Sequence, residues 1–155
     1  MKAVKFKQFE LVIALCAIAA NAFSASPISV SNTNDDGDGS LRAAITQANM
    51  AGGGEVTFCV TNTITLLSPL PSLTNISITR PGTNLLTISG GNQVPVFAMN
   101  SGTTNTLSGL TIANGMAQGY ETETFPYVAF TFASGISNGG SLKLLNCVVQ
   151  DCTNL

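Results

Sequence analysis

The sequence predicts an all-β solenoid that is closed at its N-terminal end by a short capping α-helix. Composition is the first reason. Charged residues make up only 9% of the 155 residues and 15 residues are glycine, a mix that favours strands and turns over a helical bundle. The second reason is a run of short apolar segments that follow one another after Glu55. The third is an amphipathic segment directly before them, placed to cover an otherwise open end of the stack.

Residues 1–22 are expected to be a signal peptide that is removed on export. Three lysines open the chain, and residues 11–20 form an apolar stretch that is short for a membrane span. Small residues precede a cleavage point after Ala22 or, as a second choice, Ser24. An uncleaved membrane anchor and a lipid anchor on Cys16 are the alternatives. The lipid anchor is disfavoured because the residue before Cys16 is large and the apolar run continues past it.

The remainder of the chain is acidic and carries three cysteines. Three basic and seven acidic residues follow position 22, a net charge of −4, so the sequence offers no basic patch for nucleic acid. Cys59, Cys147 and Cys152 can be joined by one disulfide in three ways, and their apolar surroundings favour buried free thiols instead. With no histidine in the chain, a Cys/His metal site is excluded.

A short helix is predicted between a polar turn and a run of glycines. Ser40 is placed as its N-cap, where the hydroxyl would accept a backbone hydrogen bond, and Gly52–Gly54 would end it. The apolar face of this helix consists of Leu41, Ala44, Ile45 and Ala48, which recur at helical spacing. We therefore expect an N-terminal unit at 23–54 that holds a first strand at 27–32 and the capping helix.

Residues 55–155 are expected to form the rungs of the solenoid. The expected strands are 56–60, 63–67, 75–79, 85–89, 96–99, 106–112, 128–132 and 142–149, each bounded by Gly, Asn, Ser or Pro. Ile88, Leu110 and Leu142 are interpreted as equivalent positions of repeats about 20–30 residues long. The excess length of one repeat falls in residues 116–127, which read as an inserted loop. A β-sandwich is the alternative that also fits strands of this number and length.

Two sets of motifs give a resemblance to a known group of proteins. The first is SNTNDDGDGSLRAAITQAN, followed by VTFCV and ITLLSPLPSL, and the second is TNTLSGLTIANG with SGISNGGSLKLLNCVVQDC. They resemble the N-terminal signature and the repeats of polymorphic outer membrane proteins and autotransporter-like adhesins. Pectate-lyase-like enzymes share that scaffold. The resemblance covers about residues 28–155 and implies a right-handed parallel β-helix, located at the cell surface, in the outer membrane or outside the cell.

The chain departs from the pattern of that group in two places. Ala43 stands where the signature often has Glu, so only the Ser40 half of a capping box is present. The sequence stops at Leu155, where members of the group continue into more rungs and a membrane barrel or sorting signal. We therefore expect a fragment of a longer protein, a truncated reading frame, or a chain that self-associates or stacks on a partner through an open β-edge.

The polar turn before the helix has a second interpretation, as a calcium site. Asn32, Asn34 and Asp36 match the spacing of three EF-hand ligands, and Gly37 matches the turn glycine. The twelfth position is Ala43, where a bidentate Glu is required. The helix-cap interpretation is therefore preferred, and any calcium binding is expected to be weak.

Support for catalysis is weak in the sequence. A lyase on this fold needs grouped acidic calcium ligands and a base, yet no predicted strand carries a carboxylate pair. Arg80 is the best base by type and reads as a solvated turn residue. A hydrolase needs two facing carboxylates, for which Glu55 and Asp151 are the candidates. We expect no catalysis and no cofactor, with a pectate-lyase-like polysaccharide-degrading enzyme as the alternative.

A binding module without catalysis is the preferred functional interpretation. The inserted loop holds aromatic and acidic side chains typical of a binding surface: Tyr120, Glu121, Glu123, Phe125 and Tyr127. Packing of Phe125 and Tyr127 onto the solenoid is the structural alternative. We expect an exported, adhesin-like or structural module whose partner is a host or neighbouring cell surface, a glycan or matrix. Contact with a membrane is expected only through a part of the protein beyond this sequence.

Overall fold

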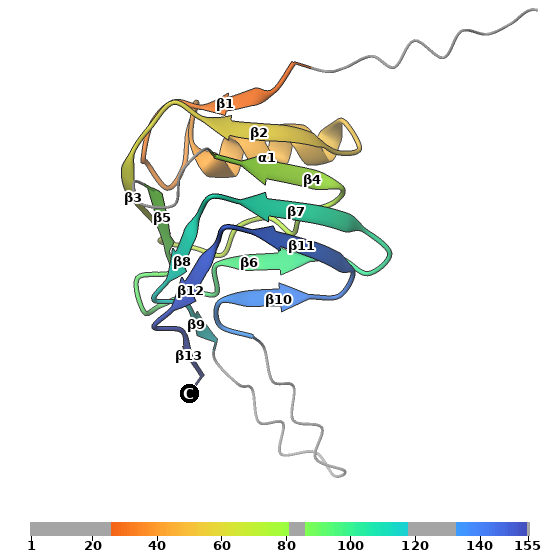
Figure 1. Ribbon diagram of the computed structural model, residues 1–155. Coiled ribbons are helices and arrows are strands. Elements are labelled where there is room, and N and C mark those ends of the chain that lie inside the picture. Colours follow the sequence, from red (N-terminus) through yellow and green to blue (C-terminus); the bar gives the residue numbers. More distant parts are fainter. Residues whose placement is uncertain (1–25, 81–85, 118–132, 155) are drawn as a thin grey trace, which may run out of the picture.

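Parallel β-sheets surround one apolar core, and a helix lies at one end of the stack (Figure 1). The computed structural model describes residues 26–80, 86–117 and 133–154, and strands dominate in these ranges. The predicted all-β class is thereby confirmed at the level of a β-rich fold of parallel sheets. The elements are β1 (Ile28–Val30), α1 (Leu41–Met50), β2 (Gly54–Phe58), β3 (Asn62–Thr65), β4 (Ile76–Thr79), β5 (Leu86–Ser89), β6 (Phe97–Met99), β7 (Thr104–Ser108), β8 (Thr111–Ala113), β9 (Met116–Ala117), β10 (Ile136–Asn138), β11 (Ser141–Leu145), β12 (Val148–Gln150) and β13 (Thr153–Asn154).

The chain passes repeatedly between two main sheets. One, which we call the long sheet, has the strand order β1-β2-β4-β7-β11, and the second sheet has the order β12-β8-β5-β3. Strands β6 and β10 form a third sheet, and β9 and β13 a fourth. Every one of these pairs is parallel. A strand of the long sheet is followed along the chain by a strand of the second sheet, as in β4–β5 and β7–β8, and we call each such pass a layer.

The core is built from columns of apolar side chains that point inward from successive layers. Ile64, Ile88 and Ile112 stand in register on β3, β5 and β8, and each is 0% exposed. On this sheet the three isoleucines recur at equal intervals along the chain. The long sheet contributes a matching column of Val56, Ile78 and Leu107, also 0% exposed. Burial of each such side chain contributes about 1.5–3 kcal/mol.

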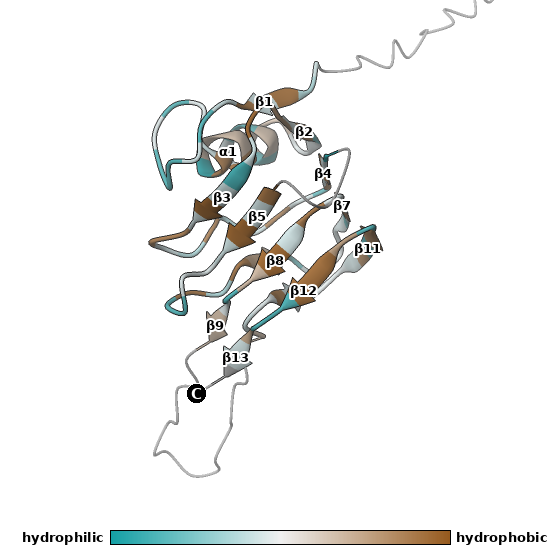
Figure 2. Ribbon diagram, turned by 60° about the vertical axis from the view of Figure 1, so that its left-hand side comes forward, coloured by the Kyte–Doolittle hydropathy of each residue, from teal (hydrophilic) through white to brown (hydrophobic). Residues whose placement is uncertain are grey.

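Two predicted strands are each divided by a sharp corner. The segment 106–112 contains β7 and β8, which are separated at Gly109, where φ is 73°. The segment 142–149 contains β11 and β12, which are separated at Asn146, where φ is 51°. Glycine and asparagine tolerate this left-handed backbone, so a single residue can turn the chain from one sheet into the next. Figure 2 shows the four strands of the second sheet, β3, β5, β8 and β12, side by side.

The predicted repeat offset is wrong. Ile88 pairs with Ile112 and not with Leu110, and the partner of Leu142 is Asn105. The error arises because the segment 106–112 was treated as one strand. It contains β7 and β8, and the corner between them changes which positions face inward. The short strands β9, β10 and β13 were not predicted, since two or three residues show no periodicity.

Helix α1 packs against the first strands of the long sheet. Ser40 is its N-cap residue, and its hydroxyl accepts a hydrogen bond of 3.1 Å from the Ala43 amide. Leu41 and Ile45 are 1% and 0% exposed, and the helix contacts β1, β2 and β4. The helix ends at Met50 in a glycine turn, where the Gly53 amide donates to the Ala48 carbonyl at 2.9 Å. The apolar face of α1 therefore takes the place that strands occupy in later layers.

Several predicted segments lie outside the described residues. These are the signal peptide at 1–22, most of the inserted loop, and the strand expected at 128–132. Met116 and Ala117, the first residues assigned to that loop, belong instead to strand β9. In the three described ranges, no helix is both long enough and apolar enough to cross a membrane.

Replacement of Gly109 by Ala is expected to destabilise the fold more than replacement of Gly102 by Ala, although both glycines have φ of 73°. A Cβ in this left-handed backbone costs about 1–2 kcal/mol at either position. At Gly102 the new atom meets nothing within 4 Å, whereas at Gly109 it collides with the carbonyl of Arg80 in the adjacent layer. We expect a further loss of about 1–3 kcal/mol for G109A, measured as the free energy of unfolding in urea. Equal losses would contradict the close approach of layers at this corner.

Candidate functional site: the N-terminal cap and the open end

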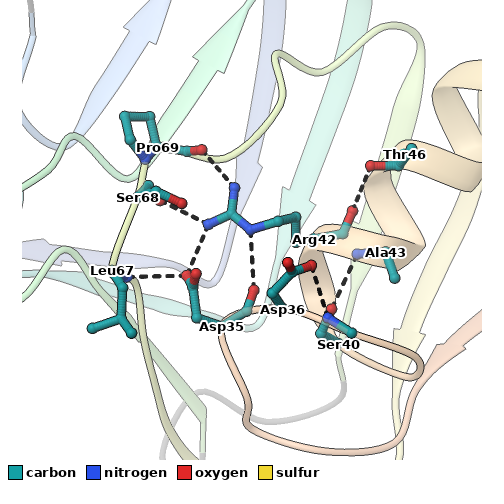
Figure 3. Close-up of polar contacts among 10 residues, drawn as sticks. Asp35, Asp36, Ser40, Arg42, Ala43, Thr46, Leu67, Ser68 and Pro69 are labelled. Atoms are coloured by element: carbon teal, nitrogen blue, oxygen red, sulfur yellow. Dashed lines mark hydrogen bonds and ion pairs between the residues drawn. The ribbon is translucent and has the colours of Figure 1, made fainter.

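The guanidinium of Arg42, in the first turn of α1, is held by Asp35 and by the carbonyls of Ser68 and Pro69 (Figure 3). Its Nη2 lies 2.8 Å from Asp35 Oδ1 and donates to the Ser68 carbonyl, also at 2.8 Å. Nε donates to the Asp35 carbonyl at 3.1 Å, and Nη1 donates to the Pro69 carbonyl at 2.6 Å. The same Asp35 Oδ1 accepts from the Leu67 amide at 3.0 Å. We call this group of five residues the Arg42 clamp.

The Arg42 clamp joins three segments that are distant in sequence: the turn before α1, the first turn of the helix, and the turn after β3. The ion-paired side chains of Arg42 and Asp35 are only 15% and 13% exposed. Hydrogen bonds to charged groups contribute about 1.5–3 kcal/mol when shielded from water. Arginine suits this position because its planar fork can reach a carboxylate and several carbonyls at once. The clamp therefore fixes the helix onto the end of the stack.

The three candidate calcium ligands lie in one turn, but the structure uses two of their side chains to hold that turn. Asn32 Oδ1 accepts from the Asn34 amide at 3.1 Å, and Asn32 Nδ2 donates to the Asp38 carbonyl at 2.8 Å. Asp36 Oδ1 accepts from the Gly37 amide at 2.7 Å. Such local bonds are typical of turns that lead into a helix. The described residues contain no group of three or more Cys, Asp or Glu side chains placed to hold a metal ion.

Asn49, near the end of α1, makes a second link between the helix and the stack. Its Nδ2 donates to the Ser72 carbonyl at 2.8 Å, and its Oδ1 accepts from the Thr74 amide at 3.1 Å. The signature motif of the sequence thus has a structural role at most of its positions, from Asn32 to Asn49. Sequence reasoning missed Asp35, Arg42 and Asn49. The available signal was that all three lie within the segment SNTNDDGDGSLRAAITQAN, which carries the resemblance.

An open groove runs along the exposed side of α1, next to the clamp. Its volume is about 520 Å³, and a smaller hollow of about 260 Å³ lies between β1 and the helix. The groove is lined by Asp36, Gly37, Asp38, Arg42, Ala43, Thr46, Gln47 and Met50. Of these, Arg42 is already engaged by carbonyls and Asp35, so the groove is an open concavity in which the lining side chains form no convergent catalytic set.

The candidate catalytic residues are not brought together. Glu55 lies on β2, where its Oε1 accepts from the Thr79 hydroxyl at 2.8 Å, whereas Asp151 follows β12 in the last described layer. Two layers separate the strands that carry them. The interpretation of Arg80 as a solvated residue is wrong, because its Nε and Nη1 atoms are buried and have no hydrogen-bond partner in the described ranges. Arg80 continues the inward alternation of Ile76 and Ile78, which explains its burial.

The three cysteines are free thiols. Cys147 and Cys152 are half-buried, and their Sγ atoms donate to the carbonyls of Leu107 and Gln150, each at 3.3 Å. Cys59 is exposed, which differs from the buried position expected for it, and its Sγ lies 3.0 Å from the Ser29 hydroxyl. No disulfide links the three thiols in the described structure.

The last described layer ends in an open apolar surface. Leu144 on β11 pairs with Leu107, which is 0% exposed, yet Leu144 itself is 44% exposed. Val149 on β12 pairs with the fully buried Ile112 and is 48% exposed. Among the described strands, β11 and β12 each have a neighbour on one side only. We call the exposed surface of Leu144 and Val149 the end face; Leu145 and Val148 are also exposed but point to the opposite side of their strands.

The five residues of the candidate binding loop, Tyr120 to Tyr127, lie outside the described residues. A binding role for them stays a prediction. The chain was also compared with known proteins, and no family model, curated protein or solved structure matches it.

Replacement of Arg42 by Lys is expected to lower the free energy of unfolding by about 1.5–3 kcal/mol, although the charge is kept. The lysine ammonium cannot reach Asp35 and the two carbonyls together, so buried acceptors would lose their partners. The matched control is Gln47→Ala, an exposed position on the same helix, where a change within about 0.5 kcal/mol is expected. A R42K variant with the urea midpoint of the parent chain would contradict the role of the clamp.

Proposed function

We propose that this chain is an exported module of a right-handed parallel β-helix protein, which acts by binding or by structural support and not by catalysis. The observation that carries the proposal is the way the motif around Arg42 closes one end of a stack of parallel layers. Repeated passes between the same two sheets, with inner columns in register, support the β-helix. Parallel crossovers within one sheet are right-handed in about 98% of cases, which supports the handedness.

The N-terminal cap supports a role at the start of the β-helix. A stack of parallel layers exposes apolar side chains and unpaired strand edges at each end, and both promote association unless they are covered. Here α1 buries Leu41 and Ile45 against the first strands, and the Arg42 clamp holds the helix in place. The signature residues are thus engaged in folding, which leaves recognition to loops and faces. The resemblance to surface adhesins favours a location at the cell surface, in the outer membrane or outside the cell.

The candidate recognition surface is the inserted loop, now bounded at its start by β9. Its aromatic side chains can supply contact area, and its two glutamates favour a partner with basic or hydroxyl groups. A polysaccharide lyase is the alternative from the same resemblance. In the described ranges no three acidic side chains are grouped as its calcium ligands would be, and Glu55 and Asp151, the pair considered for a hydrolase, lie two layers apart.

The purified chain is expected to bind saturably to whole cells, matrix protein or immobilised glycan, and to lose that binding when residues 118–127 are replaced by a Gly/Ser linker. Two matched variants separate the causes: Tyr120, Phe125 and Tyr127 changed to Ser, or Glu121 and Glu123 changed to Gln. Loss in the first variant identifies aromatic contacts, because they supply most of the energy of small interfaces.

The same preparation, incubated with pectin-like polymers and calcium, is expected to release no unsaturated sugar, which would absorb in the ultraviolet. Such a product would contradict the proposal and favour the lyase. Binding that is equal in the linker variant would contradict the role of the loop, while leaving the β-helix itself untouched.

A further inference from the structure

We draw no further inference here: the strongest candidate, the Arg80 side chain at the corner between β4 and β5, has two buried guanidinium nitrogens without a hydrogen-bond partner among the described residues, but residues 81–85, which follow it directly, lie outside them, so nothing in the structure shows which acceptor meets this charge.

Discussion

The parallel register of the layers is the constraint on which the rest of this structure depends. Ile64, Ile88 and Ile112 stand directly beside one another, so Ile88 and Ile112 are each covered by a layer on both sides, and Ile64, on the edge strand β3, by a layer on one side. A single layer cannot bury its own apolar residues, so stability is shared between neighbours. Inner layers of such a stack can all use the same pattern of apolar residues, whereas an end layer leaves one side of its apolar residues uncovered. The two ends of the described stack differ in how that side is covered.

At the N-terminal end, helix α1 takes the place of a further strand layer, and the Arg42–Asp35 ion pair helps to hold it there. Leu41 and Ile45 supply the apolar surface that the missing layer would have supplied, and they do so at helical spacing. Arg42 and Asp35 then attach the helix to the turn after β3 through shielded hydrogen bonds. At the other end no helix covers Leu144 in the described ranges, and the inner columns end at the exposed side chains of Leu144 and Val149. The first layers are thus covered by a helix that hydrogen bonds hold in place, whereas the last described layer exposes Leu144 and Val149.

Part of this architecture can be predicted from the sequence alone. The helix could be predicted because Ser40, the glycines after it and an apolar face at 3.6-residue spacing all point to the same element. The corners could not, because Gly109 and Asn146 interrupt apolar runs that read as continuous strands. That error moved the repeat by two residues and paired Ile88 with the wrong partner. Local sequence patterns predict where a helix or strand lies. The pairing register between strands depends in addition on which single residue adopts a left-handed backbone at each corner.

The capping helix was predicted from the spacing of its apolar residues and from Ser40. The Arg42 clamp, which holds that helix in place, was not predicted. Ser40 is visible in sequence because capping is local, within three residues. The Arg42 clamp depends on the carbonyls of Ser68 and Pro69. These lie close to Arg42 only because β2 and β3 bring the chain back to the helix. The burial of two guanidinium nitrogens of Arg80 was not predicted for a similar reason, since it follows from inward alternation along a whole strand. Contacts between backbone groups distant in sequence leave no local pattern to read.

The most direct measurement of the central claim is a set of methyl–methyl nuclear Overhauser effects among the isoleucines of the second sheet. Parallel neighbours lie about 4.8 Å apart, so next-but-one neighbours lie about twice as far. The register predicts strong effects for Ile64–Ile88 and Ile88–Ile112 and a much weaker one for Ile64–Ile112. Absence of the two neighbour effects, or a strong Ile64–Ile112 effect, would contradict the layered parallel stack and return the β-sandwich as the account of the fold.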